Sequence, residues 1–318
     1  MTANGLTRTK RARAALAALL LLCSLLALGA MRSDLFPASA ANPAPRMEAE
    51  AFPFALLAVA AGLFAATRRA RWPRGRQLSS SIVIGLGLFV APSLLVHFAH
   101  GWVSAFTRVV LFSLVPVFAA VFEPYMSHTA GSHRGGGLLA ALASLLGMLC
   151  VFPVDAPGSI EAGAAFAATI IAAACVAAAN CYAVELASEL PGSTVAPMAA
   201  IAGAATALGL IVASAATEGL TWRLSVSGSD LAWWTVVTLP GLLLLFWLMP
   251  RITAVRMTTR FVLAPLMAIL IGMAIDRPTV GPRIWLGLLL AAGGAAWLLF
   301  APDDGPDANS STLKLNRS

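Results

Sequence analysis

The chain reads Leu114-Val115-Pro116-Val117-Phe118-Ala119 in its first half and Leu263-Ala264-Pro265-Leu266-Met267-Ala268 in its second. The two prolines, at positions 116 and 265, are offset by 149 residues. Upstream, Pro92 and Pro240 recur at an offset of 148. Chance similarity is the alternative, since proline and small apolar residues are common in transmembrane helices. The shared spacing favours an internal repeat that covers most of the chain.

The composition indicates that most residues face an apolar solvent. Of the 318 residues, 59% are hydrophobic and 11% are charged, whereas soluble domains carry about 25% charged residues. A soluble core of this length would leave more exposed apolar surface than a monomer tolerates. We therefore predict an all-α integral membrane protein, because a helix satisfies its own backbone hydrogen bonds in lipid.

Ten apolar runs qualify as transmembrane helices, each of which needs about 20 mostly apolar residues. The second run is the shortest. The runs are 13–31, 52–67, 80–98, 103–123, 136–153, 161–184, 194–216, 230–249, 258–275 and 282–300.

The repeat offset covers five of these helices, and five is an odd number. The second half is therefore predicted to cross the membrane upside down relative to the first, as in many secondary transporters. The predicted organisation has residues 1–155 as the first five-helix repeat and 156–301 as the second, inverted repeat. Residues 302–318 form a polar tail that we expect to be disordered and cytoplasmic.

The net charge of +7 does not indicate nucleic acid, because the basic residues lie in blocks beside apolar runs. Basic juxtamembrane residues stay in the cytoplasm. These blocks are Arg8, Lys10, Arg11 and Arg13, the loop Arg68–Arg76, and Arg251, Arg256 and Arg260. We predict a multi-pass protein of the plasma (cytoplasmic or inner) membrane with both termini cytoplasmic. The acidic loop 185–192 and the basic loop 276–283 fit this topology poorly.

The amino terminus permits a second interpretation. A basic start, an apolar stretch and Ala38-Ser39-Ala40 together are similar to a secretory signal peptide. However, the apolar run from Ala14 to Ala30 exceeds the usual signal core of ~7–15 residues. Cleavage would also leave nine spans and break the repeat. We expect residues 14–30 to be the first transmembrane helix.

Proline lacks a backbone N–H, so each repeated proline is predicted to release a carbonyl from the helical ladder. The released carbonyls would be those of Leu88, Phe112, Val236 and Phe261. A freed carbonyl is costly in lipid and should face a cavity, a neighbouring helix or a ligand. Pro92 and Pro240 are therefore predicted helix breaks, and Pro116 and Pro265 are predicted to line the substrate site.

These features resemble the EamA-like members of the drug/metabolite transporter superfamily, in which a five-helix unit occurs twice. The resemblance covers nearly the whole chain. In that family a pattern like Leu-x-Pro-x-Phe-Ala-Ala occurs in the fourth and ninth helices, similar to residues 113–122 here. The closing helix is similar at Gly287-Leu-Leu-Leu-Ala-Ala-Gly293-Gly294-Ala-Ala-Trp297. The short links His97–Trp102 and Pro250–Arg256 also resemble those of the family.

Departures from the family pattern make an inherited substrate unsafe. In the place of the acidic residue that follows the ninth helix of the family, this chain has Asp276, and the spacer from Asp276 to Gly287 is longer than in the family. The equivalent place after the fourth helix holds Ser127 and His128, and the first helix lacks a Trp-Gly-like opening.

Arg108 is the foremost candidate for substrate binding, because an arginine inside a transmembrane helix costs about 2.5–3.5 kcal/mol on insertion scales. It lies about two turns before Pro116 in the predicted outer half of its span. There it would hold an anionic or carbonyl-bearing substrate or, alternatively, extend to the outer interface. Under the 149-residue offset Thr107 pairs with Arg256, so Arg108 and Arg256 would guard opposite mouths of one cavity. A role as cytoplasmic anchors is the simpler interpretation of Arg256 and Arg260.

The sixth span carries Asn180, Tyr182 and Glu185 on neighbouring turns, and Asn180 and Tyr182 are further candidates for lining the cavity. A polar bond between helices is the alternative for Asn180. The small-residue motif Gly203-x-x-x-Ala207 is interpreted as close helix packing.

The predicted function is secondary transport, most simply export, of a small organic metabolite by alternating access. A proton or a counter-solute would be the coupling partner, and a homodimer is left open. No phosphate-binding loop or nucleotide motif appears. The four cysteines lie in apolar runs without C-x-x-C spacing or a histidine cluster, which predicts no disulfide framework and no zinc site. The sequence also has no H-E-x-x-H helix and no paired intramembrane aspartates, so no cofactor, metal or catalytic residue is expected. The alternatives are an intramembrane enzyme that acts on lipid and a non-transporting assembly subunit.

Overall fold

The computed structural model describes residues 3–30, 47–126, 136–217, 219, 228–276 and 281–300. The predicted tail 302–318 and the signal-like residues 38–40 lie outside the described residues.

The described residues form helices joined by short loops, with no strand among them. The first half contains α1 (Ala3–Ala30), α3 (Met47–Thr67), α4 (Arg76–Gly85), α5 (Ala91–Ala99), α6 (Ala105–Phe112), α7 (Val115–Met126) and α8 (Gly136–Val151). The second half contains α9 (Ile160–Glu189), α10 (Val195–Thr217), α11 (Gly228–Trp233), α12 (Leu239–Leu248), α13 (Ala254–Thr258), α14 (Arg260–Asp276) and α15 (Pro282–Phe300). Two π-helical turns, η1 (Leu86–Val90) and η3 (Trp234–Thr238), and two 3-10 turns, η2 (Gly192–Thr194) and η4 (Met249–Arg251), connect helices.

Eight helical segments of the described chain are long and apolar enough to cross a membrane. Two further apolar helices are shorter, Ala14–Leu28 and Gly136–Val151. Each of the ten predicted runs coincides with one of these segments. The prediction of an all-α, multi-pass membrane protein is confirmed.

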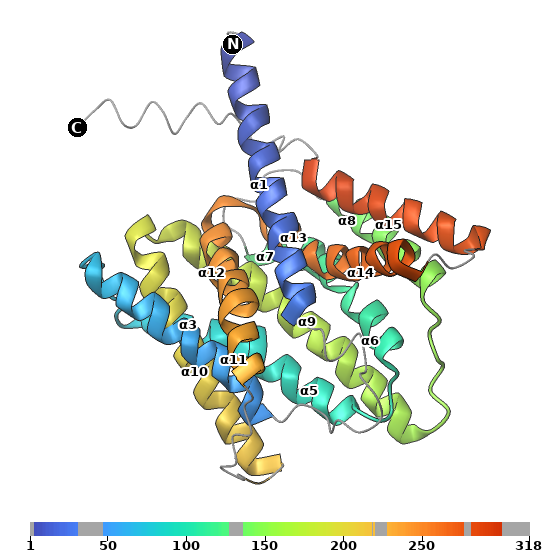
Figure 1. The fold of residues 1–318 in the computed structure, drawn as a ribbon, viewed down its shortest axis with the longest axis horizontal. Helices are drawn as coiled ribbons and strands as arrows, with labels where there is room; N and C mark the ends of the chain where they lie inside the picture. Colours follow the sequence, from blue (N-terminus) through green and yellow to red (C-terminus); the bar gives the residue numbers. More distant parts are fainter. Residues whose placement is uncertain are drawn as a thin grey trace.

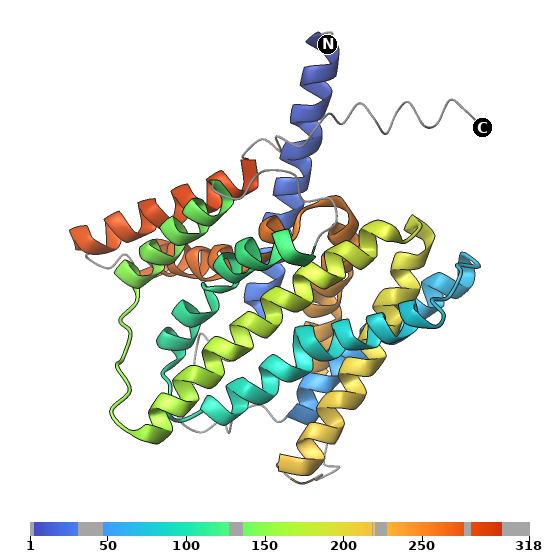
Figure 2. The same cartoon turned by 180° about the vertical axis from the view of Figure 1, so that it is seen from behind.

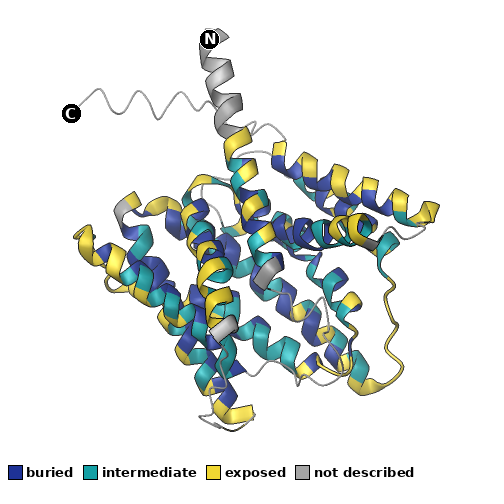
Figure 3. Cartoon of the chain, viewed as in Figure 1, coloured by how far each residue is buried: buried dark blue, intermediate teal, exposed yellow. Residues whose placement is uncertain are grey.

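Large apolar side chains face outward on the peripheral helices, as expected for surfaces in contact with lipid. Leu63 and Phe64 of α3, Leu139 of α8, and Leu289 and Trp297 of α15 are all exposed. Figure 3 shows the same pattern, with exposed positions along the outer faces of α3 and α15 and buried positions turned inward.

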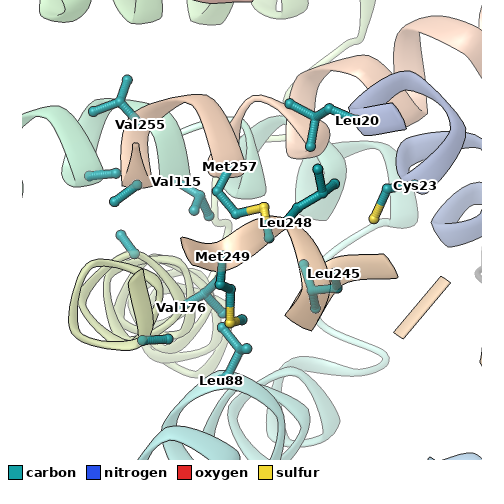
Figure 4. Close-up of a cluster of buried hydrophobic side chains, with 14 of the residues drawn as sticks. Leu20, Cys23, Leu88, Val115, Val176, Leu245, Leu248, Met249, Val255 and Met257 are labelled. Atoms are coloured by element: carbon teal, nitrogen blue, oxygen red, sulfur yellow. The ribbon is translucent and has the colours of Figure 1, made fainter. Parts of the chain in front are cut away.

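The main core lies around α9, which runs through the middle of the molecule beneath α1 and α12 (Figure 1). The side chains drawn in Figure 4 come from helices of both halves and converge on the link between α12 and α13, where Leu248, Met249 and Met257 are fully buried. Val115 of α7 and Val176 of α9 belong to the same cluster. The two halves therefore share one core.

Two antiparallel helix pairs, α3 with α10 and α8 with α15, make the largest helix contacts. Each pair joins one helix of the first half to one of the second, and α8 lies beside α15 in both views (Figures 1 and 2). Small residues allow the close approach. A Cβ on Gly203 would lie 2.9 Å from the carbonyl oxygen of Phe54 in α3, so the predicted close packing at Gly203 is confirmed.

The two π-turns recur at the same offset as the prolines that follow them. The amide of Ala91 donates to the carbonyl of Leu86, and the amide of Leu239 donates to that of Trp234. Pro92 and Pro240 then occupy the second residue of α5 and α12. The missing proline N–H is accommodated by widening the preceding turn, because a π-turn bonds five residues apart. The predicted helix breaks are thus π-turns, and the helix axis continues.

A second pair of equivalent features lies at the starts of α6 and α13. The Ser104 side chain accepts a hydrogen bond from the amide of Thr107, and the Thr253 side chain accepts one from the amide of Arg256. Both are N-cap interactions, and the caps are 149 residues apart. The caps therefore recur in register with Pro116 and Pro265.

The interruptions inside these two spans differ in position. The first lies at Ser113 and Leu114, so Pro116 becomes the second residue of α7. The second lies at Thr259, more than one turn before Pro265, and α14 continues through that proline. Neighbouring helices support the interior proline of a membrane helix, so it need not end the helix.

Candidate functional site

The described structure places four of the sequence-predicted site residues in four different surroundings. Asn180 lies in the centre of the molecule, Arg108 lines a cavity at one end of α6, and Arg256 lies in the first turn of α13. Tyr182 lies on the α4 side of α9, where its hydroxyl is 2.5 Å from the hydroxyl of Ser80. These four side chains therefore do not form a single contiguous site.

Asn180 is fully buried in α9 and connects two helices. Its Nδ2 donates to the carbonyl of Val176 at 2.7 Å, and its Oδ1 accepts a hydrogen bond from Nη2 of Arg260 at 3.5 Å. The contact joins α9 to α14. Asn180 thus makes the interhelical polar bond considered from the sequence, and its partner there is a charged group.

Arg260 is buried, with only 7% of its surface exposed. Its guanidinium carbon lies 4.9 Å from the centre of the Phe261 ring. Within the described residues, Nη1 has no hydrogen-bond partner and no carboxylate pairs with the guanidinium. The interpretation of Arg260 as a cytoplasmic anchor was therefore wrong.

The sequence contained a signal for this position, because the predicted span 258–275 includes Arg260. Its assignment to a basic juxtamembrane block depended on Arg251 and Arg256, which precede it on the same side. The tertiary structure then buries it: residues 257–260 are all shielded from solvent. The pattern of apolar residues does not show which face of the helix at Arg260 packs against other helices.

An aromatic pair lies next to Arg260. The rings of Phe112 and Phe261 stack at 6.1 Å between centroids. These two residues are 149 positions apart, and each lies four residues before one of the repeated prolines, Pro116 and Pro265. The contact joins the end of α6 in the first half to the start of α14 in the second half.

Cys23 of α1 also faces this centre. Its thiol is 3.7 Å from the carbonyl oxygen of Gly241 in α12, and Cys23 belongs to the buried cluster against which Phe112 and Phe261 pack. Figure 4 shows Cys23 directed toward the core that Leu20 and Leu245 line. The central site (Cys23, Phe112, Asn180, Arg260 and Phe261) is therefore formed by helices of both halves.

Arg108 lines a separate cavity of about 480 Å³, at the end that the charge pattern predicts to be external. His100, Ser104 and Asp155 also line it. Thr107, which is almost completely buried, accepts hydrogen bonds from the Ser104 hydroxyl and from the amide of Asp155. These bonds tie the α8–α9 loop to the start of α6. The lining of the cavity contains one cationic side chain, Arg108, and one anionic side chain, Asp155.

At the opposite end of the bundle, α13 begins against α7. An oxygen of the Glu123 carboxylate accepts a hydrogen bond from the amide of Ala254 at 3.1 Å. Arg256, the third residue of α13, donates from Nε to the carbonyl of Leu298 at 3.3 Å. The start of α13 is thus held by α7 on one side and α15 on the other.

We expect Glu123→Ala to release the first turn of α13, because the amide of Ala254 loses its carboxylate acceptor. The loss of a capping acceptor costs about 1 kcal/mol. Hydrogen–deuterium exchange of the peptide that contains Ala254 should become at least several-fold faster. Glu123→Gln keeps an acceptor oxygen and is the matched control. Equal exchange in wild type and Glu123→Ala would show that the contact does not hold α13.

No group of three potential metal-ligating side chains occurs among the residues that the structure describes. The central site instead offers one guanidinium, one amide, one thiol and two aromatic rings. Such a set binds by charge, hydrogen bonding and apolar contact.

Comparison with known proteins identifies the fold and no family. No protein-family model matches the chain, and no curated protein sequence matches it. Among solved structures, one described as a crystal structure of a protein covers 92% of this chain and 99% of its own, with a TM-score of 0.67 and 18% sequence identity. At this identity the likeness is one of fold alone. The arrangement of helices is therefore one that an experimentally determined protein also adopts.

Proposed function

We propose that this chain is a secondary transporter that moves a small organic solute across the cytoplasmic membrane, most simply outward. The ten apolar segments would form two inverted five-helix repeats, residues 1–155 and 156–301, with both termini in the cytoplasm. Alternating access would open the central site to one side and then the other. The resemblance of the sequence to EamA-like transporters supports the same conclusion.

The observation that carries this proposal is the recurrence of π-turn and proline in the two halves. Equivalent interruptions at an offset of 148 in η1–α5 and η3–α12 are expected of a duplicated unit. The antiparallel pairs α3–α10 and α8–α15 support inversion, because a two-fold axis in the membrane plane reverses each helix relative to its equivalent. π-turns are also frequent at functional sites in helices.

Flux of small organic acids, amines and neutral metabolites into proteoliposomes, with and without a proton gradient, tests the proposal directly. A resistance screen on an expressing strain narrows the panel of solutes first. Accumulation or release that depends on the protein supports transport. Failure of every solute that the screen selects would refute it.

We expect the double substitution Pro92→Ala and Pro240→Ala to lower this flux at least about tenfold while the protein stays folded. Alanine restores two backbone N–H groups, so the π-turns can relax to α-helix and rotate the upstream halves of both helices by about one residue. The thermal stability should be unchanged or higher, because proline is unfavourable within a helix.

Pro124→Ala is the matched control, since Pro124 lies inside α7 without a counterpart in the other half. Its flux should stay close to that of the wild type. Equal flux in the double variant and the control would separate the π-turns from transport.

A further inference from the structure

The buried charge of Arg260 has no counter-charge in the described structure. Removing a guanidinium from water is costly unless an anion or several acceptors replace the lost hydration. Asn180 supplies one oxygen to Nη2 at 3.5 Å, and the face of the Phe261 ring supplies a weak cation–π interaction. Both groups are neutral, and Nη1 has no partner.

From this site we propose that the solute is a carboxylate-bearing organic anion that Arg260 binds through Nη1. This inference rests on the proposed transport function and names its substrate class. The guanidinium fork matches the two oxygens of a carboxylate. An anion in the site therefore supplies both the missing acceptor and the missing charge.

The surroundings favour a monoanion with an apolar body. The stacked rings of Phe112 and Phe261 lie beside the guanidinium and provide an apolar wall. A phosphate dianion would bring two charges to a site with one cation, and the excess charge would remain desolvated. A cationic solute would be repelled by Arg260.

The position of Arg260 explains how such a site can alternate between the two faces. Arg260 is the first residue of α14, directly after the interruption at Thr259, and its neighbour Phe261 contacts the equivalent Phe112 in the other half. Arg260 is 7% exposed and its Nη1 is inaccessible to solvent, so a solute reaches the guanidinium only when the two halves move apart. If the two halves separate on one side of the Phe112–Phe261 contact, Nη1 would become accessible from the membrane face on that side.

The test uses the purified full-length protein in nanodiscs with benzoate as the probe. Benzamide is its neutral analogue of the same shape, and benzylamine is its cationic analogue. Benzoate should raise the thermal unfolding temperature in a concentration-dependent way, because a ligand of the native state stabilises it. Benzamide and benzylamine should raise it little or not at all.

Two substitutions locate the effect. Arg260→Gln should lower benzoate affinity at least about 50-fold, and Arg260→Lys, which keeps the charge without the fork, about 5- to 20-fold. Arg283→Gln is the control, because the exposed Arg283 donates to the carbonyl of Leu149, outside the central site. If Arg260→Gln does not fold, the comparison of benzoate with benzamide and the lysine variant decides.

The outcomes separate this inference from the proposed function. Equal stabilisation by benzoate and benzamide, or unchanged benzoate affinity in both Arg260 variants, overturns the anion site. Flux of a neutral or cationic solute that does not depend on Arg260 would leave transport standing and overturn the substrate class. Binding of benzoate through Arg260 without flux of any carboxylate would support the site and refute transport.

Discussion

Gly294→Leu should destabilise the protein by about 3 kcal/mol or more, because α8 and α15 meet at this glycine without room for a side chain. A Cβ on Gly294 would lie 2.3 Å from the hydroxyl of Ser144 and 2.5 Å from the carbonyl oxygen of Ala140. The carbonyl belongs to the α8 backbone, so the whole helix must move. Overpacking of this kind typically costs about 1–3 kcal/mol, and more when the backbone must shift.

The neighbouring Gly293 provides a matched control on the same helix. It is exposed, and nothing lies within 4 Å of the Cβ that a substitution would add. Gly293→Leu should leave the unfolding temperature unchanged or raise it, because glycine is a poor helix former. The measurement is thermal unfolding of both variants in the same detergent, and Gly294→Leu should unfold several degrees lower.

This pair of variants tests the helix packing independently of any transport activity. Membrane helices associate through close van der Waals contact between small residues, since lipid provides no hydrophobic drive between them. Equal unfolding temperatures for the two variants would mean that α8 and α15 do not pack through Gly294. The pairing of the fifth predicted span with the tenth would then be wrong.

The sequence predicted the helices well because the hydrophobic requirement of a bilayer is strong and local. All ten apolar runs coincide with helical segments, and the repeated prolines at 92 and 240 mark equivalent π-turns. The form of the interruptions was not predictable, because a proline only removes a donor. Whether the helix then widens, as at Pro92, or continues, as at Pro265, depends on neighbouring helices.

The central site was predictable only in part. Asn180 was identified because it lies with Tyr182 and Glu185 on neighbouring turns of an otherwise apolar span. Arg260 was missed because the rule that basic juxtamembrane residues stay in the cytoplasm considers only how close a residue is to the helix end. It does not consider which face of the helix the residue occupies. Two contacts hold the buried side chain, one with Asn180 of α9 and one with the adjacent Phe261, and the first joins residues far apart in the sequence.

Asn180→Asp is expected to raise stability and abolish anion binding in the same protein. The new carboxylate would replace the amide whose oxygen lies 3.5 Å from Nη2 of Arg260. A guanidinium at this distance favours the ionised carboxylate, so the buried charge gains a permanent partner. We expect the unfolding temperature to rise by several degrees, which corresponds to about 2 kcal/mol.

The same carboxylate would occupy the positive field that an incoming anion requires. Benzoate affinity should therefore fall at least about 100-fold, although the side chain keeps nearly the volume of asparagine. Thermal unfolding with and without benzoate, together with carboxylate flux in proteoliposomes, measures both effects. Asn180→Leu is the contrasting variant, because it removes the oxygen acceptor and should destabilise the protein by about 1.5–3 kcal/mol.

The opposite signs of the two effects make Asn180→Asp informative. A variant that is merely damaged loses stability together with function, whereas a neutralised binding site gains stability while it loses its ligand. If Arg260 contacts only Asn180 and Phe261 and does not bind the anion, the added carboxylate would leave benzoate affinity unchanged. Unchanged affinity in a more stable Asn180→Asp protein would therefore show that Arg260 is structural, and a joint gain in stability and loss of affinity would identify it as the group that receives the anion.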